Sequence, residues 1–213
     1  MPARERLNQD LQGENQLGIL LMVQMGGVPE ELQLLIQIVT VDKVNQTLQE
    51  GNAYMVRVLG VREHRVSLGM FRSIFWAKDH PILYHHNSPE WQLRFEGMPS
   101  DVNALMIDLR ATYGATFGPW RDIAQDLNHE MPLSNLLQQG KGILGTFPKP
   151  LAERFINVLA HHGIQSKYEE VNPAPEPDTK MKGFKDQLSV LGIDDSYFIA
   201  YSFMVDFFKG RGQ

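Results

Sequence analysis

The sequence predicts an α+β fold, in which an antiparallel β-meander precedes a two-layer β-α-(α)-β-α-β arrangement, ferredoxin-like in outline, and an apolar segment ends the chain. Three observations support this prediction. Short apolar runs separated by turn residues recur at intervals of about 8–12 residues in the first half. Two strand–Pro–helix–Gly stretches of matching length follow, and a proline-rich stretch precedes the final apolar run.

The residues up to position 96 carry the patterns that are typical of strands. Residues 17–25 alternate along the chain and end at Gly26-Gly27. Asp42 predicts the N-cap of a short helix that ends at Gly51. The polar residues 1–16 predict a frayed N-terminus. Further strands are expected at 53–61 and 65–71, which flank a tight connection at 62–64, and at 74–77, 82–86 and 91–96.

Two helices of similar length are predicted in the second half. The first, 100–113, follows Pro99 and ends at Gly114, and the second, 149–162, follows Pro148 and ends at Gly163, an interval of 15 residues in both cases. Proline before the first turn and glycine after the last turn is the asymmetry that helices favour. An apolar stripe on the first helix is expected to cover a sheet: Val102, Leu105, Met106, Leu109 and Tyr113. Residues 164–171 predict one more strand.

The domain organisation follows from these elements. Residues 17–171 form the predicted main α+β region, which allows a division into subdomains 17–90 and 91–171. Residues 172–183 are rich in proline and predict an extended linker. Residues 184–213 are then a C-terminal apolar segment that either returns to its own core or docks on a second chain.

The apolar run 197–208 motivates a prediction of self-association. Asp195 or Ser196 could cap a helix here, yet apolar side chains would lie on nearly all sides of that helix. Such a segment must be buried on more than one side. We therefore expect a homo-oligomer, with four aromatic residues at the interface: Tyr197, Phe198, Phe203 and Phe207.

Composition excludes several classes of function. With 43% hydrophobic and 21% charged residues the chain is expected to fold. A net charge of −5 without a Lys/Arg cluster makes nucleic-acid binding an unlikely task, and the absence of cysteine excludes thiolate metal sites and thiol nucleophiles. The polar N-terminus is no secretory signal, and no apolar run reaches the roughly 20 residues of a membrane span. We expect a cytoplasmic, soluble protein with no cofactor and no metal.

Histidines supply one candidate site. Asp79, His80 and His85 lie close together in the sequence, and imidazole and carboxylate groups suit metal binding or acid–base chemistry near neutral pH. His86 is expected to point to the opposite face of the predicted strand. His161 and His162 fall at a helix C-terminus, where the helix dipole favours them without any ligand. Structural roles in caps and turns are the favoured interpretation of all these residues.

A glycine pattern supplies a second candidate. Gly140, Gly142 and Gly145 match G-x-G-x-x-G, and Glu169 and Glu170 end the following strand. The residues before Gly140 predict a helix instead of a strand, and the next helix begins only after Pro148, so its N-terminus lies outside the glycine segment. A glycine-rich turn is the favoured interpretation, with nucleotide or phosphate binding as the alternative.

Taken with the absence of a coherent catalytic constellation, these patterns favour a non-catalytic binding or regulatory protein that self-associates. One alternative is an enzyme or ligand-binding protein with a site at Asp79, His80 and His85. Another is phosphate or nucleotide binding at 140–145. Strand aromatics and methionines could also line a pocket for a small apolar ligand, or contact another protein, although a packed core explains most of them.

Overall fold

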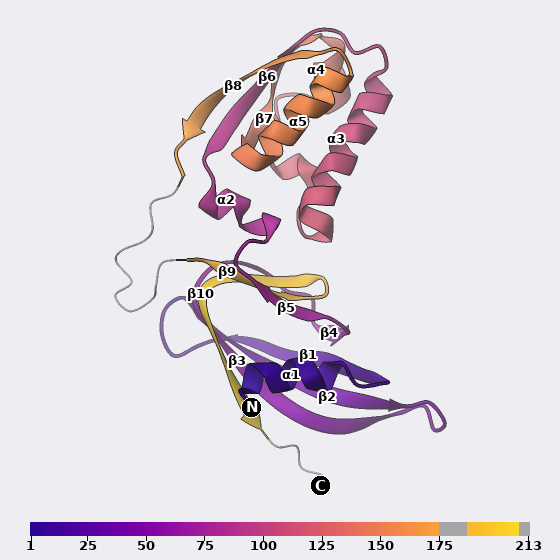
Figure 1. Ribbon diagram of the computed structural model, residues 1–213, viewed down its shortest axis with the longest axis vertical. Helices are drawn as coiled ribbons and strands as arrows, with labels where there is room; N and C mark the ends of the chain where they lie inside the picture. Colours follow the sequence, from indigo (N-terminus) through magenta and orange to yellow (C-terminus); the bar gives the residue numbers. More distant parts are fainter. Residues whose placement is uncertain (175–186, 209–213) are drawn as a thin grey trace. The chain divides into compact units, whose positions relative to one another are not determined.

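The computed structural model describes residues 1–174 and 187–208 and combines helices with a large antiparallel sheet (Figure 1). The chain divides into two compact units. Unit 1 contains Met1–Asp79 and Asp178–Gln213, and unit 2 contains His80–Pro177. The predicted linker at 172–183 lies largely outside the described residues, and its first residue, Asn172, ends a strand of unit 2.

Unit 1 is built on one antiparallel sheet of seven strands in the described residues. Their order is β4-β1-β2-β3-β10-β9-β5. The first three strands along the chain pair in sequence, whereas the meander is predicted from the later strands between 53 and 96. The bounds are β1 (Gln16–Met25), β2 (Glu31–Asp42), β3 (Thr47–Arg65), β4 (Gly69–Phe71), β5 (Ile74–Ala77), β9 (Ser189–Ile193) and β10 (Ser196–Phe208).

Two local predictions in unit 1 are wrong. Asp42 does not begin a helix: its carboxylate accepts hydrogen bonds from the N–H groups of Val44 and Asn45, which makes a turn, and β3 starts at Thr47. The charged residues 62–64 do not form a hairpin turn, because β3 continues through them to Arg65 and pairs there with the start of β10.

The two edge strands of this sheet are neighbours in the chain. β4 and β5 stand at opposite ends of the strand order, yet only Arg72 and Ser73 separate them. The sheet must therefore curl until these two edges approach each other. Asp194, in the turn between β9 and β10, fixes this junction by accepting hydrogen bonds of 2.9 Å from the N–H groups of both Arg72 and Ser73.

The N-terminal residues, for which a frayed start is predicted, contain a helix in the structure. Residues Ala3–Leu11 form helix α1, which packs against the sheet of unit 1. Leu7 is completely buried, and the guanidinium of Arg6 lies 3.9 Å from the centre of the Phe207 ring. One apolar side chain in each helical turn is enough to dock this otherwise polar segment.

The C-terminal apolar run is a strand instead of a helix. β10 pairs with β3 over most of its length and with β9 at its start. Phe198 and Ala200 are buried in the core of unit 1, which explains the apolar character of the segment. Of the two fates predicted for this run, return to its own core is therefore the one that the structure shows for residues 196–208.

Beyond a short helix at 84–87, unit 2 follows the order strand, helix, helix, strand, helix and strand. Its three described strands lie in the order β7-β6-β8, all antiparallel, so the four-stranded ferredoxin-like arrangement is not confirmed. Residues 82–86, predicted as a strand, belong to a 3-10 turn and a short helix, because His80 caps them by accepting a hydrogen bond from the Ile82 N–H. The bounds are α2 (Tyr84–Asn87), β6 (Glu90–Glu96), α3 (Val102–Phe117), α4 (Leu133–Gln138), β7 (Lys141–Pro148), α5 (Lys149–His161) and β8 (Gln165–Asn172), with 3-10 turns at Pro81–Leu83, Gly118–Trp120 and Ile123–Gln125.

The two long helices begin and end for local reasons. The Asp101 carboxylate caps α3 by accepting hydrogen bonds from the N–H groups of Asn103 and Ala104. Gly114 does not end this helix, which continues to Phe117 and stops at Gly118, whose φ is +61°. Gly163 follows α5 with a φ of +72°, as the predicted glycine stop requires.

The helices cover one face of the three-stranded sheet in unit 2 (Figure 1). Along β6, every second side chain points into the helical layer and is buried: Trp91, Leu93 and Phe95. The predicted stripe on α3 packs against them, with Leu105, Leu109 and Tyr113 buried. The intervening residues of β6, Gln92, Arg94 and Glu96, are half-buried or exposed, and no helix of the described part of unit 2 covers them.

Candidate functional site

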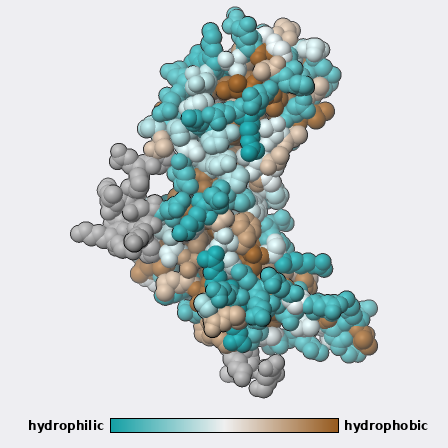
Figure 2. All heavy atoms as spheres, viewed as in Figure 1, coloured by the Kyte–Doolittle hydropathy of each residue, from teal (hydrophilic) through white to brown (hydrophobic). Residues whose placement is uncertain are grey.

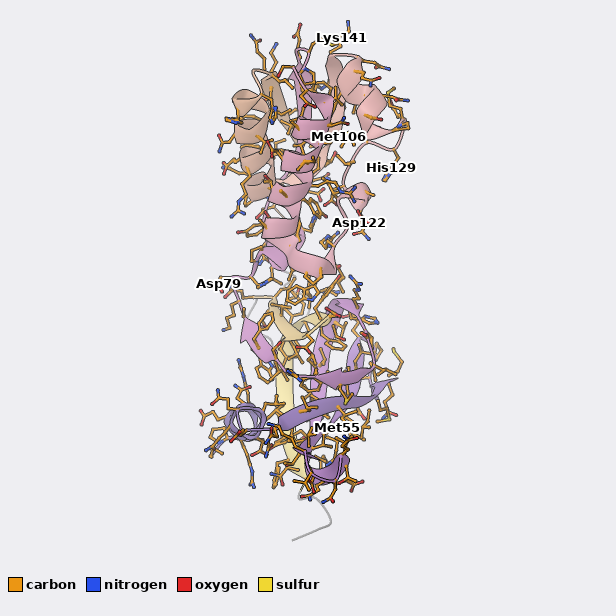
Figure 3. The ribbon with its side chains drawn as sticks, turned by 90° about the vertical axis from the view of Figure 1, so that its right-hand side faces the viewer. Met55, Asp79, Met106, Asp122, His129 and Lys141 are labelled. Atoms are coloured by element: carbon orange, nitrogen blue, oxygen red, sulfur yellow. The ribbon has the colours of Figure 1, made fainter. Side chains whose placement is uncertain are left out.

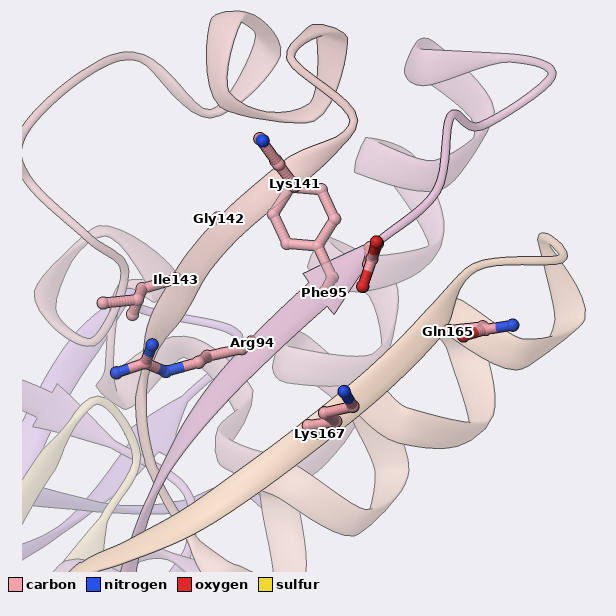
Figure 4. A pocket seen from close by; sticks show the side chains of 8 residues that line it. Arg94, Phe95, Lys141, Gly142, Ile143, Gln165 and Lys167 are labelled. Carbon is pink, nitrogen blue, oxygen red and sulfur yellow. The ribbon is translucent and has the colours of Figure 1, made fainter.

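A basic hollow lies on the sheet of unit 2 (Figure 4). Its three cations, Arg94, Lys141 and Lys167, come from three different strands, β6, β7 and β8. The cavity has a volume of ≈ 430 Å³. The remaining lining residues are Phe95, Glu96, Gly142, Ile143 and Gln165. We call this set of eight residues the basic hollow.

Strand register brings the three cations together. Arg94 lies directly opposite Lys167 on one side and Ile143 on the other, and Glu96 lies between Lys141 and Gln165. Side chains two apart on a strand share a face, and neighbouring strands are about 4.8 Å apart. Arg94 and Lys167 are therefore cross-strand neighbours, and Lys141 lies on the same face, two residues further along the sheet, opposite Glu96. Figure 3 shows Lys141 at the end of unit 2, beyond the loop that carries His129.

The hollow has an excess of positive charge. Arg94 donates a hydrogen bond of 3.0 Å to the side chain of Gln92, a neutral partner. In residues 1–174 and 187–208, neither Lys141 nor Lys167 has an ion-pair partner. Glu96 is the one carboxylate that lines the hollow. Three cations against one anion make this surface suitable for an anionic ligand.

The aromatic side chains of the sheet do not form a stacking platform in this hollow. Trp91 is buried toward the helices, and Tyr168 stacks on it with ring centroids 3.9 Å apart. Phe95, which lines the hollow, is only 3% exposed. Single-stranded nucleic acids are usually held by bases stacked on exposed aromatic rings, and this surface lacks that feature in its described lining.

The glycine pattern has structural explanations at each position. Gly140 follows α4 with a φ of +70°. A Cβ at Gly142 would lie 2.6 Å from Leu136, and a Cβ at Gly145 would lie 2.3 Å from the carbonyl oxygen of Asp126. Residues 141–148 form a strand, preceded by a helix, so the strand–loop–helix context of a dinucleotide site is absent here. Of the three glycines of the pattern, only Gly142 lines the basic hollow.

The structure does not bring Asp79, His80 and His85 to one point. Asp79 is exposed and ends the first segment of unit 1. His80 uses Nδ1 to cap the 3-10 turn, and its ring lies 5.0 Å from that of Trp120. His85 instead faces two carboxylates of unit 2, Asp126 and Glu90. The residues therefore have separate surroundings.

His85 belongs to a buried polar cluster with Glu90, Tyr113, Arg121 and Asp126. Its Nε2 lies 3.3 Å from Asp126 Oδ2 and its Nδ1 lies 3.7 Å from Glu90 Oε1. The Tyr113 hydroxyl donates a 2.8 Å hydrogen bond to Asp126, whose side chain is 8% exposed. Burial, and then this hydrogen bond, raise the pKa of Tyr113 well above its ordinary value. These contacts link α2, α3 and the segment 121–126, so the cluster has a structural role.

The predicted interface residues divide between core and surface of unit 1. Tyr197 is 4% exposed and Phe198 is completely buried, and Phe198 belongs to the core cluster of the unit. Phe203 and Phe207 are half-buried. Exposed hydrophobic residues occur in small groups among hydrophilic ones (Figure 2). Self-association through this segment stays a prediction.

No group of His, Cys, Asp and Glu side chains in the described residues could hold a metal ion. Within the same residues, no helix is long and apolar enough to cross a membrane. Comparisons of the chain with known protein families, with curated proteins and with solved structures find no match. The case for a function therefore depends on the geometry of the site.

Sequence reasoning missed the three cations of the basic hollow. Arg94 and Lys167 lie 73 positions apart in the sequence and meet only because β6 and β8 are neighbours in the sheet. A signal was available, since Arg94 and Glu96 alternate with the buried Leu93 and Phe95 and so belong to the opposite face. What the pattern did not reveal is that this face lacks a covering layer.

Proposed function

We propose that the protein is a non-catalytic binding protein and that the basic hollow binds a small ligand that carries phosphate. The observation behind this proposal is that Arg94, Lys141 and Lys167, from three different strands, line one cavity. A guanidinium can bind two phosphate oxygens at once, and ammonium groups add point charges that satisfy the remaining oxygens. The cavity volume lies in the range of small-molecule sites.

Two features favour a small ligand over nucleic acid. The lining has no exposed aromatic ring on which bases could stack, and the net charge of the chain is −5. These features support binding of a small anionic ligand.

Calorimetric titration of the full chain with inorganic pyrophosphate tests the proposal. We expect saturable binding that is about tenfold weaker, or more, in each of Arg94→Gln and Lys141→Gln, because a hydrogen bond to a charged group contributes about 1.5–3 kcal/mol. Lys43→Gln is the matched control, since Lys43 is exposed in a turn of unit 1 and is not one of the hollow-lining residues.

Citrate serves as the second probe, because carboxylates could use the same cations. Phosphate chemistry predicts that citrate binds at least tenfold more weakly than pyrophosphate. Equal affinities of the wild-type protein and the two hollow variants for pyrophosphate would overturn the site. Preferential binding of citrate would overturn the ligand class.

A further inference from the structure

The outer edge of β8 is an unpaired strand edge. β8 pairs with β6 on one side, and no strand in residues 1–174 and 187–208 pairs with its other side. It contains eight residues, and only Ser166 among them is not exposed. A strand edge presents free N–H and C=O groups, which form a template for another strand.

The opposite edge of the same sheet is covered. There, the segment around Leu127 runs antiparallel to β7 and forms a bridge with Gly145. The Thr146 N–H donates to the Asp126 carbonyl at 3.2 Å, and the Asn128 N–H donates to the Leu144 carbonyl at 2.9 Å. Within the described residues, unit 2 therefore protects the β7 edge of its sheet and leaves the β8 edge open.

We propose that two copies of the chain associate through β8, paired antiparallel about Tyr168, to form one continuous six-stranded sheet. This inference does not depend on the proposed function, because it uses the edge of the sheet and not the ligand. The partner is a second copy of the chain, because two antiparallel β8 strands centred on Tyr168 place the opposite charges of Lys167 and Glu169 against each other.

The charges of β8 specify this register. In an antiparallel pair centred on Tyr168, Lys167 of each copy lies opposite Glu169 of the other, and both residues belong to the open face of the sheet. A parallel, in-register pair would instead place Lys167 against Lys167 and Glu169 against Glu169, which is repulsive. The antiparallel register has two ion pairs related by the two-fold axis.

Tyr168, at the centre of the proposed pair, is exposed and is already held in one orientation. Tyr168 is 56% exposed, so it has surface left to bury. Its ring is already held by stacking on Trp91, and the Lys149 ammonium lies 5.1 Å from the Trp91 ring centre. Ordering Tyr168 against Tyr168 of the second copy therefore loses little side-chain entropy, and cross-strand aromatic pairs are favourable.

Sedimentation equilibrium of the full chain over a range of concentrations tests this proposal. The wild-type protein is expected to show a monomer–dimer equilibrium. Glu169→Lys places lysine opposite lysine at both symmetric positions and should raise the dissociation constant about tenfold or more. Glu169 does not line the basic hollow, so pyrophosphate binding should persist in this variant.

The double variant K167E/E169K restores opposite charges and should return the dissociation constant to within about threefold of wild type. Glu170→Lys is the matched control, because Glu170 would lie opposite the neutral Ser166 and its reversal should have little effect. Circular dichroism checks that each variant is folded. A wild-type protein that is monomeric at all concentrations would overturn the proposal, as would a dimer that E169K does not weaken or that the double variant does not restore.

Discussion

Gly145 is the position where a single added carbon should disturb unit 2 most clearly. The segment 126–128 runs antiparallel beside β7 here, and a Cβ on Gly145 would lie 2.3 Å from the Asp126 carbonyl oxygen and 3.1 Å from the Leu127 Cα. Both contacts are with backbone atoms, which cannot move aside without moving the segment. Gly145→Ala should therefore push the segment away from β7.

The expected cost follows from what that movement breaks. Two backbone hydrogen bonds join the segment to β7, Thr146 N–H to Asp126 and Asn128 N–H to Leu144, each with a net value of about 1 kcal/mol. Overpacking strain adds about 1–3 kcal/mol. We expect Gly145→Ala to lower the free energy of unfolding of unit 2 by about 3–5 kcal/mol.

Gly114→Ala is the matched control. Gly114 lies inside α3, is exposed, and has open space where a Cβ would be. Alanine is about 1 kcal/mol better than glycine in a helix, so this variant should be more stable than wild type. The same chemical change should thus have opposite signs at the two glycines.

Urea unfolding followed by tryptophan fluorescence measures both effects. Unit 2 contains Trp91 and Trp120, and unit 1 contains Trp76, so a Trp76→Phe background reports on unit 2 alone. A Gly145→Ala protein at least as stable as its parent would refute the reasoning about the 126–128 segment. Destabilisation by Gly114→Ala would refute the reasoning about α3.

Three further predictions concern pH and the core. Burial raises the pKa of Tyr113, so the folded residue stays protonated while the unfolded one ionises near pH 10. The free energy of unfolding should therefore fall above about pH 10, and it should fall less in Tyr113→Phe. Urea midpoints measured over this pH range test the prediction. Burial alone would raise the pKa of Asp194, but hydrogen bonds from Ser73 and Arg72 and the Arg72 charge lower it. Asp194→Ala should therefore cost about 1–2 kcal/mol in unit 1 at pH 7, and its deficit relative to wild type should shrink as the pH falls below about 4. Leu7→Ala removes a fully buried side chain and should cost about 2–4 kcal/mol and accelerate amide exchange in α1.

Each of these has a clear contrary result. A pH dependence unchanged in Tyr113→Phe above pH 10 would contradict the account of that hydroxyl. An Asp194→Ala deficit that stays constant down to pH 2 would contradict the role given to the carboxylate. Wild-type exchange rates in α1 of Leu7→Ala would show that Leu7 does not anchor the helix.

Local patterns predicted the elements whose partners are close in the sequence. The alternation in residues 17–25 predicted β1, and the proline and glycine signals around 149–162 predicted α5 within one residue of its bounds. The run at 197–208 was interpreted as a possible helix because Asp195 or Ser196 could cap it, and its apolar residues on nearly all sides then indicated burial on more than one side. A strand that is buried at one end and exposed at the other gives the same composition.

Some failed predictions were local, at Asp42, at residues 82–86 and at Gly114, and the others depended on pairing between distant segments. Residues 62–64 are charged and suggested a turn, but they belong to β3 because β10, more than 130 residues later, pairs with them. The basic hollow was missed for the same reason, since Arg94 and Lys167 meet only through strand order. Which strand lies beside which is decided by the packing of the whole sheet, and the local sequence does not record it.

The central claim is that an anionic ligand binds between β6, β7 and β8, and chemical-shift mapping tests it most directly. In ¹H–¹⁵N spectra of the full chain titrated with pyrophosphate, the account predicts saturable shifts concentrated in residues 94–96, 141–143 and 165–167. These shifts should be lost in Arg94→Gln. Absence of saturable shifts, or shifts concentrated in unit 1 or around the buried polar cluster at His85, would contradict the claim.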